Sequence, residues 1–263
     1  MSPVDRFDTS VAHPARRYNY WLGGKDHFAA DRESGDLLVR AFPTARLAAR
    51  ENRDFLRRSV HYLASSGVRQ FLDIGTGLPV PDNTHEIAQR IDPSARVLYV
   101  DNDPIVMTHA RALTVGTPSG RTDYLEADLR EPDRILAHAA AVLDFSQPVA
   151  LLLIAVLHFL HDDTEALQSV RKLLEALPTG SYLVASNLTL DYAPPAQVAK
   201  HEELLAAGRT DARARSRTEF AHFFNGLELV EPGIVPVSDW RRTQKERPAP
   251  AEVAIYGAAG RLA

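Results

Sequence analysis

The stretch Gln70-Phe71-Leu72-Asp73-Ile74-Gly75-Thr76-Gly77-Leu78-Pro79 decides the fold class of this 263-residue chain. An apolar segment runs directly into an acid and a Gly-x-Gly turn, where missing Cβ atoms let the backbone pass close to a ligand. A second apolar segment, residues 96–100, ends at Asp101, 24 residues after Gly77. In open α/β folds, an acid about 20 residues beyond such a turn accepts hydrogen bonds from a ribose. The sequence therefore predicts a site for a cofactor that contains a nucleoside.

The residues after the two glycines distinguish between cofactors. A dinucleotide fingerprint, Gly-x-Gly-x-x-Gly, needs glycine at position 80, but this residue is Val80, flanked by Pro79 and Pro81. Proline lacks the backbone N–H that a pyrophosphate uses at the start of the following helix. The turn therefore favours a cofactor without phosphates, such as S-adenosylmethionine, and a nicotinamide dinucleotide is the less favoured alternative.

The order Asp-x-Gly-x-Gly, followed by a strand that ends in an acid, resembles the class I S-adenosylmethionine-dependent methyltransferases. Residues 122–130, TDYLEADLR, resemble the third motif of that class. The resemblance implies that Asp128 binds the adenine amino group, that the backbone N–H of Leu129 meets the ring, and that Asn102 lies beside it. A role for Asn102 as a turn residue before Pro104 stays open.

The same resemblance assigns the rest of the cofactor. It implies that Asp73 and the turn formed by Gly75, Thr76 and Gly77 hold the methionine end, and that Asp101 holds the ribose hydroxyls. Each aspartate, taken singly, is also a common N-cap or turn former. Their order in the chain, together with the glycines, favours cofactor binding.

The continuous apolar run 148–154 predicts a central parallel strand that is covered on both faces. It leads into Ala155-Val156-Leu157-His158-Phe159-Leu160, which resembles the segment that lines the methyl-transfer site in this class. Ala155 is therefore a predicted cofactor contact, and His158 is the candidate residue that faces the transferred methyl group. The reactive methyl is carried on a sulfonium, so no general base is obligatory, and a structural role for His158 stays open.

The segment 15–33, ARRYNYWLGGKDHFAADRE, narrows the resemblance. Together with residues 71–79, 100–104 and 151–160, it resembles the actinobacterial S-adenosyl methyltransferase family, formerly a domain of unknown function, over nearly the whole chain. Two adjacent glycines in a helical pattern are unusual, because each costs about 1 kcal/mol relative to alanine. A kinked segment that approaches the ligand explains them, so we predict that Tyr18, Asn19 and Gly24 contact the cofactor. An aromatic face packed into the core is the alternative.

Composition limits the function classes. The chain has no cysteine, which excludes disulfides, thiolate metal sites and a cysteine nucleophile. Its net charge of −4 predicts no nucleic-acid-binding surface. The longest apolar run, residues 149–157, is far shorter than the roughly 20 residues of a membrane span, and the N-terminus lacks a signal-peptide pattern. We therefore expect a cytoplasmic protein that acts on a small-molecule acceptor; the sequence does not indicate an oligomeric state.

Alternating strand and helix patterns predict an α/β fold with a Rossmann-like, mostly parallel sheet, helices on both faces and an antiparallel C-terminal strand. Residues 1–65 are predicted to form a helical lid over a methyltransferase domain at 66–263. The polar segment at about 188–225 predicts a helical insertion in that domain. Its arginines, Arg209, Arg213, Arg215 and Arg217, are interpreted as a solvated helix face, and binding of a substrate carboxylate or phosphate is the alternative.

Metal binding and a function without turnover are the remaining alternatives. His158 and His161 are three residues apart with Asp162 beside them, but this cluster matches no metal-ligand motif, so we predict no metal site. The recognisable motifs all concern the cofactor, and none identifies an acceptor. The sequence therefore predicts a methyltransferase with an unidentified acceptor, and a cofactor-binding sensor or interaction protein is the alternative.

Overall fold

The computed structural model describes residues 8–113 and 116–263, and residues 1–6, on which the signal-peptide expectation rests, lie outside them. The helices are α1 (Pro14–Trp21), α2 (Ala29–Ala41), α3 (Ala45–Ser65), α4 (Thr84–Ile91), α5 (Pro104–Leu113), α6 (Pro132–Ala139), α7 (Asp163–Glu175), α8 (Pro195–Ala206), α9 (Arg217–Ala221) and α10 (Pro250–Val253). The strands are β1 (Gln70–Ile74), β2 (Arg96–Asp101), β3 (Arg121–Glu126), β4 (Ala150–Ile154), β5 (Tyr182–Leu188), β6 (Leu227–Leu229), β7 (Val235–Pro236) and β8 (Ile255–Leu262). Short 3-10 turns, η2 (Leu157–Phe159) and η3 (His222–Phe224), follow β4 and α9.

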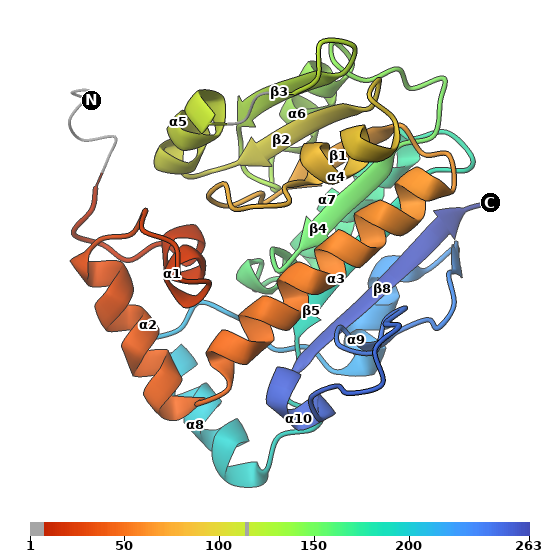
Figure 1. Cartoon of the computed structure of the whole chain (residues 1–263). Coiled ribbons are helices and arrows are strands. Elements are labelled where there is room, and N and C mark those ends of the chain that lie inside the picture. The colour runs from red at the N-terminus through yellow and green to blue at the C-terminus, as the bar shows by residue number, and fades with distance from the viewer. Residues whose placement is uncertain (1–7, 114–115) are drawn as a thin grey trace.

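The strands form one mixed sheet (Figure 1). Strands β1 to β5 are parallel in the order β3-β2-β1-β4-β5, and β8 pairs antiparallel with β5, β6 and β7. This confirms the predicted α/β class with an antiparallel C-terminal strand. The chain leaves β1 toward β2 and later returns to β4 on the other side of β1, and ligands of open α/β sheets bind at such a switch point, beyond the carboxyl ends of the strands.

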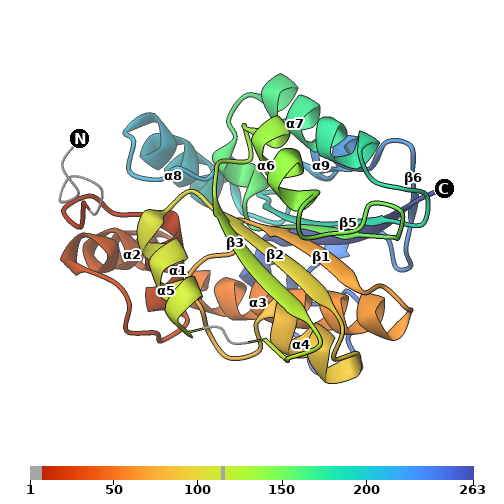
Figure 2. The ribbon, with the colours of Figure 1, turned by 90° about the horizontal axis from the view of Figure 1, so that it is seen from above.

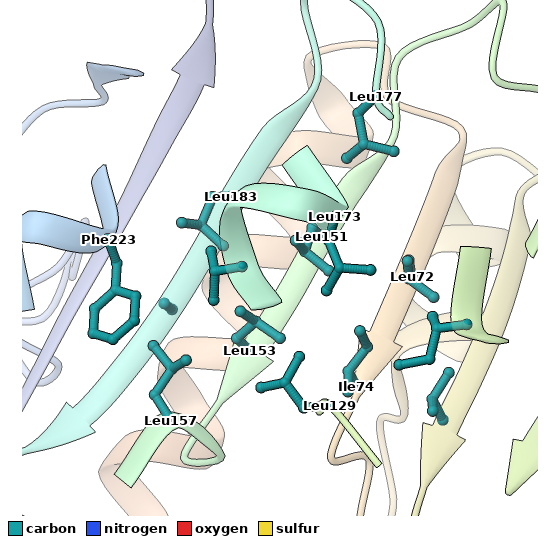
Figure 3. Close-up of a cluster of buried hydrophobic side chains, with 14 of the residues drawn as sticks. Leu72, Ile74, Leu129, Leu151, Leu153, Leu157, Leu173, Leu177, Leu183 and Phe223 are labelled. Atoms are coloured by element: carbon teal, nitrogen blue, oxygen red, sulfur yellow. The ribbon is translucent and has the colours of Figure 1, made fainter. Parts of the chain in front are cut away.

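Apolar side chains cover both faces of the sheet, which explains the unbroken apolar run of β4. Leu151 and Leu153 belong to the core on the α6, α7 and α9 side, whereas Ala150 and Leu152 belong to the core on the α3 and α4 side (Figure 3). All four side chains are fully buried. A strand covered on both faces reads as a continuous apolar run rather than an alternating one, as observed.

Helices cover both faces of the sheet and gather at the carboxyl ends of its parallel strands. Figure 2 shows α6, α7 and α9 on one side of the sheet and α3 and α4 on the other, with α1, α2 and α8 gathered at one end. Helix α3 packs along the sheet, where the ring of Phe55 meets that of Trp240 edge-on at 5.3 Å. None of the helices in the described ranges combines the length and the apolar character that a membrane span requires.

The arginine-rich segment differs from its predicted form. Residues 210–216 are not helical, and the side chain of Arg215 is fully buried. Its guanidinium donates to the carbonyls of Leu157 (2.8 Å) and Leu160 (2.7 Å) and pairs with Asp163 at 2.9 Å. The solvated-face interpretation is therefore wrong for Arg215, which instead fixes the turn that follows β4. A guanidinium carries several donors in a rigid fork, so it can satisfy several carbonyls of one turn at once.

Candidate functional site

A cavity of about 840 Å³ lies at the carboxyl ends of the parallel strands and brings most of the predicted site residues together. The predicted residues that line it are Tyr18, Asp73, Gly75, Thr76, Gly77, Asp101, Asn102, Asp128, Leu129, Ala155 and His158. Asn19 and Gly24 are not among its lining residues. The Asn19 side chain accepts a hydrogen bond from the backbone of Asp26 (3.1 Å), and the Gly24 backbone packs directly against that side chain. Close packing is therefore the reason for glycine at position 24.

Asp101 links β2 to the glycine turn after β1. The Gly77 amide donates to one carboxylate oxygen (2.8 Å) and the Asp103 amide to the other (3.0 Å). Burial nevertheless raises the pKa of Asp101 to about 6, because desolvation outweighs these two hydrogen bonds. Each oxygen keeps a further lone pair, so the carboxylate can still accept from two hydroxyl groups in the cavity.

Asp128 and Asn102 meet at the end of the neighbouring strands. The Asn102 side chain donates to Asp128 Oδ2 at 2.8 Å, and the Arg130 amide donates to Oδ1 at 2.9 Å. The Arg130 guanidinium also reaches Oδ2, at 3.0 Å. These contacts fix the orientation of the carboxylate at the wall of the cavity, beside the buried Leu129.

Asp73 is the penultimate residue of β1 and lies on the face that α3 and α4 cover. Its carboxylate accepts from the hydroxyl of Thr84 at 2.6 Å, and burial raises its pKa to about 6. The charge of Arg53 opposes that rise. Arg53 also lines the cavity, and its buried Nε has no hydrogen-bond partner within the described part of the chain. The site therefore offers an acid and a guanidinium side by side, which suits a group that carries both an amine and a carboxylate.

Comparison with known proteins decides the family. The model of the S-adenosyl methyltransferase family matches residues 2–263. The chain belongs to the S-adenosyl methyltransferase family. This confirms the family predicted from residues 15–33 and from the motifs at the strand ends. Curated proteins give no match to the sequence.

Solved structures support the family and the fold. A protein of the DUF574 family from Streptomyces avermitilis is 46% identical, with a TM-score of 0.92, and the match covers 97% of this chain and 99% of that one. A protein from Thermobifida fusca is 39% identical, with a TM-score of 0.88 and coverage of 100% and 99%. The N-methyltransferase NodS from Bradyrhizobium japonicum, in complex with S-adenosylhomocysteine, has a TM-score of 0.50 at 15% identity and covers 94% of this chain and 98% of its own. At that identity the likeness concerns the fold alone.

In this member of the S-adenosyl methyltransferase family, a buried hydrogen-bond chain ties the N-terminal helices to the loop after β4. The Ala155 amide donates to Ser186 Oγ (2.9 Å), and this hydroxyl donates to Asn52 Oδ1 (2.7 Å). The Asn52 amide then donates to the hydroxyl of Tyr18 (3.1 Å), which donates to the Ala49 carbonyl (2.8 Å). Burial raises the pKa of Tyr18 to about 12, so its hydroxyl stays a neutral donor. This chain of hydrogen bonds therefore couples two lining residues, Tyr18 and Ala155, through α3.

His158 lies in the turn after β4 with its imidazole at the cavity wall. Its Nδ1 accepts a long hydrogen bond from the Leu188 amide (3.4 Å), which assigns the proton of the neutral ring to Nε2. Burial lowers its pKa to about 3. Since one nitrogen is occupied by a donor and the other carries the proton, the ring is suited to donate a hydrogen bond rather than to accept a proton.

Sequence reasoning missed Asn52, Arg53 and Arg215. Asn52 and Arg53 lie one helical turn after Ala48 and Ala49, on the same side of α3. Polar residues therefore interrupt the apolar stripe of this helix, and that interruption could have indicated a functional role. A polar group on a buried helical stripe requires a partner, and here the partners belong to β5 and the cavity. The buried role of Arg215 had no such signal, because its side-chain partners, Leu157, Leu160, Asp163 and Asn187, lie 28 to 58 residues away in the chain.

Two glycines of the turn after β1 predict a measurable contrast. A Cβ on Gly75 would lie 2.8 Å from the Val156 side chain at a φ of +74°, whereas one on Gly77 (φ +67°) would meet nothing within 4 Å. We expect Gly75→Ala to lower the free energy of unfolding by about 3 kcal/mol, through clash and backbone strain together, and Gly77→Ala by about 1 kcal/mol. Urea denaturation of both variants checks this order, and equal losses would contradict it.

Proposed function

We propose that this chain is an S-adenosylmethionine-dependent methyltransferase that acts on a small-molecule acceptor. The observation that carries the proposal is the meeting of three carboxylates, from the ends of β1, β2 and β3, in one cavity that continues past Ala155 and His158. This cofactor supplies an activated methyl group on a sulfonium. The chain itself would bind the cofactor and the acceptor, orient them toward each other and exclude water. These are the contributions that such a transfer needs from a protein.

Each part of the cofactor has a partner of matching chemistry in the cavity. Asp73 would hold the cationic amino group of the methionine end, and Arg53 its carboxylate. The Gly75–Thr76–Gly77 turn would hold the same methionine end, and Asp101 would accept from the two ribose hydroxyls. Asp128 and the Leu129 amide would hold the adenine, with Asn102 beside the ring. Ala155 and Tyr18 would then border the sulfonium end.

The geometry of α4 disfavours a dinucleotide. This helix begins at Thr84, well beyond Gly77, so its N-terminus does not directly follow the glycine turn as a pyrophosphate site requires. Its early amide at His85 already donates to the hydroxyl of Tyr99 (2.8 Å). The donors that would hold a diphosphate are therefore displaced or engaged.

The raised pKa values of Asp73 and Asp101, each about 6, predict a pH-dependent affinity. The cationic amino group of the cofactor favours the ionised form of Asp73, so affinity rises as pH rises through about 6. We expect S-adenosylmethionine to bind about tenfold more weakly at pH 5 than at pH 7.5, since one pKa unit corresponds to about tenfold in an equilibrium constant. Calorimetric titrations across this range check it. In Asp73→Asn binding should be weaker and its pH dependence shallower; an unchanged pH profile would contradict the role of Asp73.

Binding and turnover test the proposal separately. Calorimetric titration of S-adenosylmethionine, S-adenosylhomocysteine and NAD into the purified chain should give micromolar binding for the two sulfur compounds and none for NAD. Formation of S-adenosylhomocysteine over a panel of small-molecule acceptors then tests transfer. Binding without turnover on any acceptor would favour a sensor, whereas NAD binding without the sulfur compounds would overturn the proposal.

A further inference from the structure

The cavity is longer than the cofactor-binding residues require. Beyond Ala155 and His158 it continues between two walls, and we call this part the apolar recess. One wall is formed by Trp21 of α1, Leu38 of α2, Phe42 just after α2 and Ala48 of α3. The other wall is formed by Leu188, at the end of β5, and Leu190, in the segment that follows. Figure 1 shows α8 beside α2. The edge-on contact of the Phe42 and His201 rings, at 6.0 Å, joins them.

Two ionised side chains beside the apolar recess neutralise each other. Arg17 and Asp211, which line the same cavity, pair at 2.5 Å between Nη2 and Oδ1. Arg17 is buried, and its other terminal nitrogen donates to the Ser34 hydroxyl at 3.2 Å. A charged ligand would lose its hydration here without gaining a free counter-charge, which is unfavourable. The recess therefore disfavours both anions and cations.

Two neutral imidazoles are among the polar side chains that line the apolar recess. Nε2 of His158 carries the proton and has no protein partner in the described ranges, so it is a donor available to a ligand. His201 is 96% buried, and its Nε2 likewise lacks a partner in the part of the chain that the structure describes. Burial lowers the pKa of both rings, so both stay uncharged at neutral pH. An unpaired buried polar atom is costly unless a ligand meets it.

We propose that the apolar recess binds the methyl acceptor and selects an uncharged, largely apolar molecule with a lone-pair atom that accepts a hydrogen bond from Nε2 of His158. Here His158 acts as a positioning residue that orients the acceptor toward the cavity between Tyr18 and Ala155. The identification of the bound molecule as the methyl acceptor rests on the proposed function, but the binding selectivity of the recess does not depend on it. Apolar walls with a few placed polar groups are the usual composition of small-molecule sites.

A pair of aromatic probes with the same ring system tests this selectivity. 2-Naphthol is uncharged at pH 7, whereas 2-naphthoate has the same rings and a negative charge. We expect 2-naphthol to bind in saturation-transfer NMR titrations, with and without S-adenosylhomocysteine, and 2-naphthoate to bind at least tenfold more weakly. Equal affinities, tighter binding of 2-naphthoate, or no binding of 2-naphthol would overturn the proposal.

Variants locate the binding. We expect His158→Phe to weaken 2-naphthol at least fivefold and His158→Gln, which keeps a donor near the same position, to restore most of the affinity. Ala48→Leu fills the recess from α3 and should weaken 2-naphthol tenfold, whereas the matched change Ala199→Leu, on the exposed face of α8, should have no effect. An unchanged affinity in Ala48→Leu would place the probe elsewhere and overturn the proposal, even if His158→Phe fails to fold.

The two proposals fail in different ways. Calorimetry of S-adenosylhomocysteine on the same preparations measures the cofactor site without any acceptor. If S-adenosylhomocysteine binds and the naphthol selectivity is absent, the recess assignment fails and the proposed function stands. If S-adenosylhomocysteine does not bind while 2-naphthol binds selectively, the proposed function fails and the recess is still a site for uncharged apolar molecules.

Discussion

We expect Asp101→Asn to weaken the binding of S-adenosylhomocysteine by at least about 100-fold, because both oxygens of Asp101 are already oriented by the protein. The Gly77 and Asp103 amides each point at one oxygen. An asparagine keeps the shape but presents an NH2 group to one of these two donors, and it loses the charge that strengthens bonds to ribose hydroxyls. Two hydrogen bonds to a charged group are worth about 3 kcal/mol or more, which corresponds to about 100-fold in affinity.

The measurement is calorimetric titration of S-adenosylhomocysteine into wild type, Asp101→Asn and a matched control. Asp123→Asn makes the same chemical change in the neighbouring strand β3, where the side chain is 36% exposed and away from the cavity lining. The control should bind within twofold of wild type. Thermal denaturation of all three proteins separates lost binding from lost folding. If Asp101→Asn is folded and binds within threefold of wild type, the ribose role of Asp101 is wrong.

The sheet and the cofactor motifs were predictable because they depend on local patterns. An apolar segment that ends in an acid indicates a buried strand with a polar residue at its carboxyl end, and parallel strands bring such ends to one edge. Asp73, Asp101 and Asp128 therefore line one cavity although they are far apart in the chain. Residues 15–33 were also informative, and through Tyr18 they reach the same cavity.

The parts that escaped prediction depend on contacts between distant segments. The backbone of Ala155 has a φ of +55°, an unfavourable value for a residue with a Cβ, and nothing in its sequence surroundings indicates it. Its amide is held by Ser186 Oγ on the neighbouring strand β5. The apolar recess likewise forms only when α2, α3 and the segment after β5 meet. Its selectivity is therefore a property of tertiary packing, which no local pattern encodes.

Asn52→Leu should lower the melting temperature by about 6–12 °C. Leucine has the same branching as asparagine but is bulkier, and it removes the acceptor of the Ser186 hydroxyl and the donor to Tyr18 in a fully buried setting. Breaking a buried polar network leaves its members unsatisfied, at about 3 kcal/mol here, and each kcal/mol moves the melting temperature of a domain of this size by about 2–4 °C. Differential scanning calorimetry measures the shift.

Ser59→Ala is the matched control in the same helix. Ser59 is also fully buried on α3, but its hydroxyl has no hydrogen-bond partner within the described residues, so its loss should change the melting temperature little or raise it.

Tyr18→Phe removes only the last bonds of the hydrogen-bond chain. Its effect on the free energy of unfolding should combine non-additively with that of Asn52→Leu, by 0.5 kcal/mol or more in a double-mutant cycle. Additive effects would mean that Tyr18 and Asn52 stabilise the protein independently. Because Tyr18, Asn52 and Ala155 all line the cavity, we also expect weaker S-adenosylhomocysteine binding in Asn52→Leu than in Ser59→Ala, whose side chain is not part of the lining.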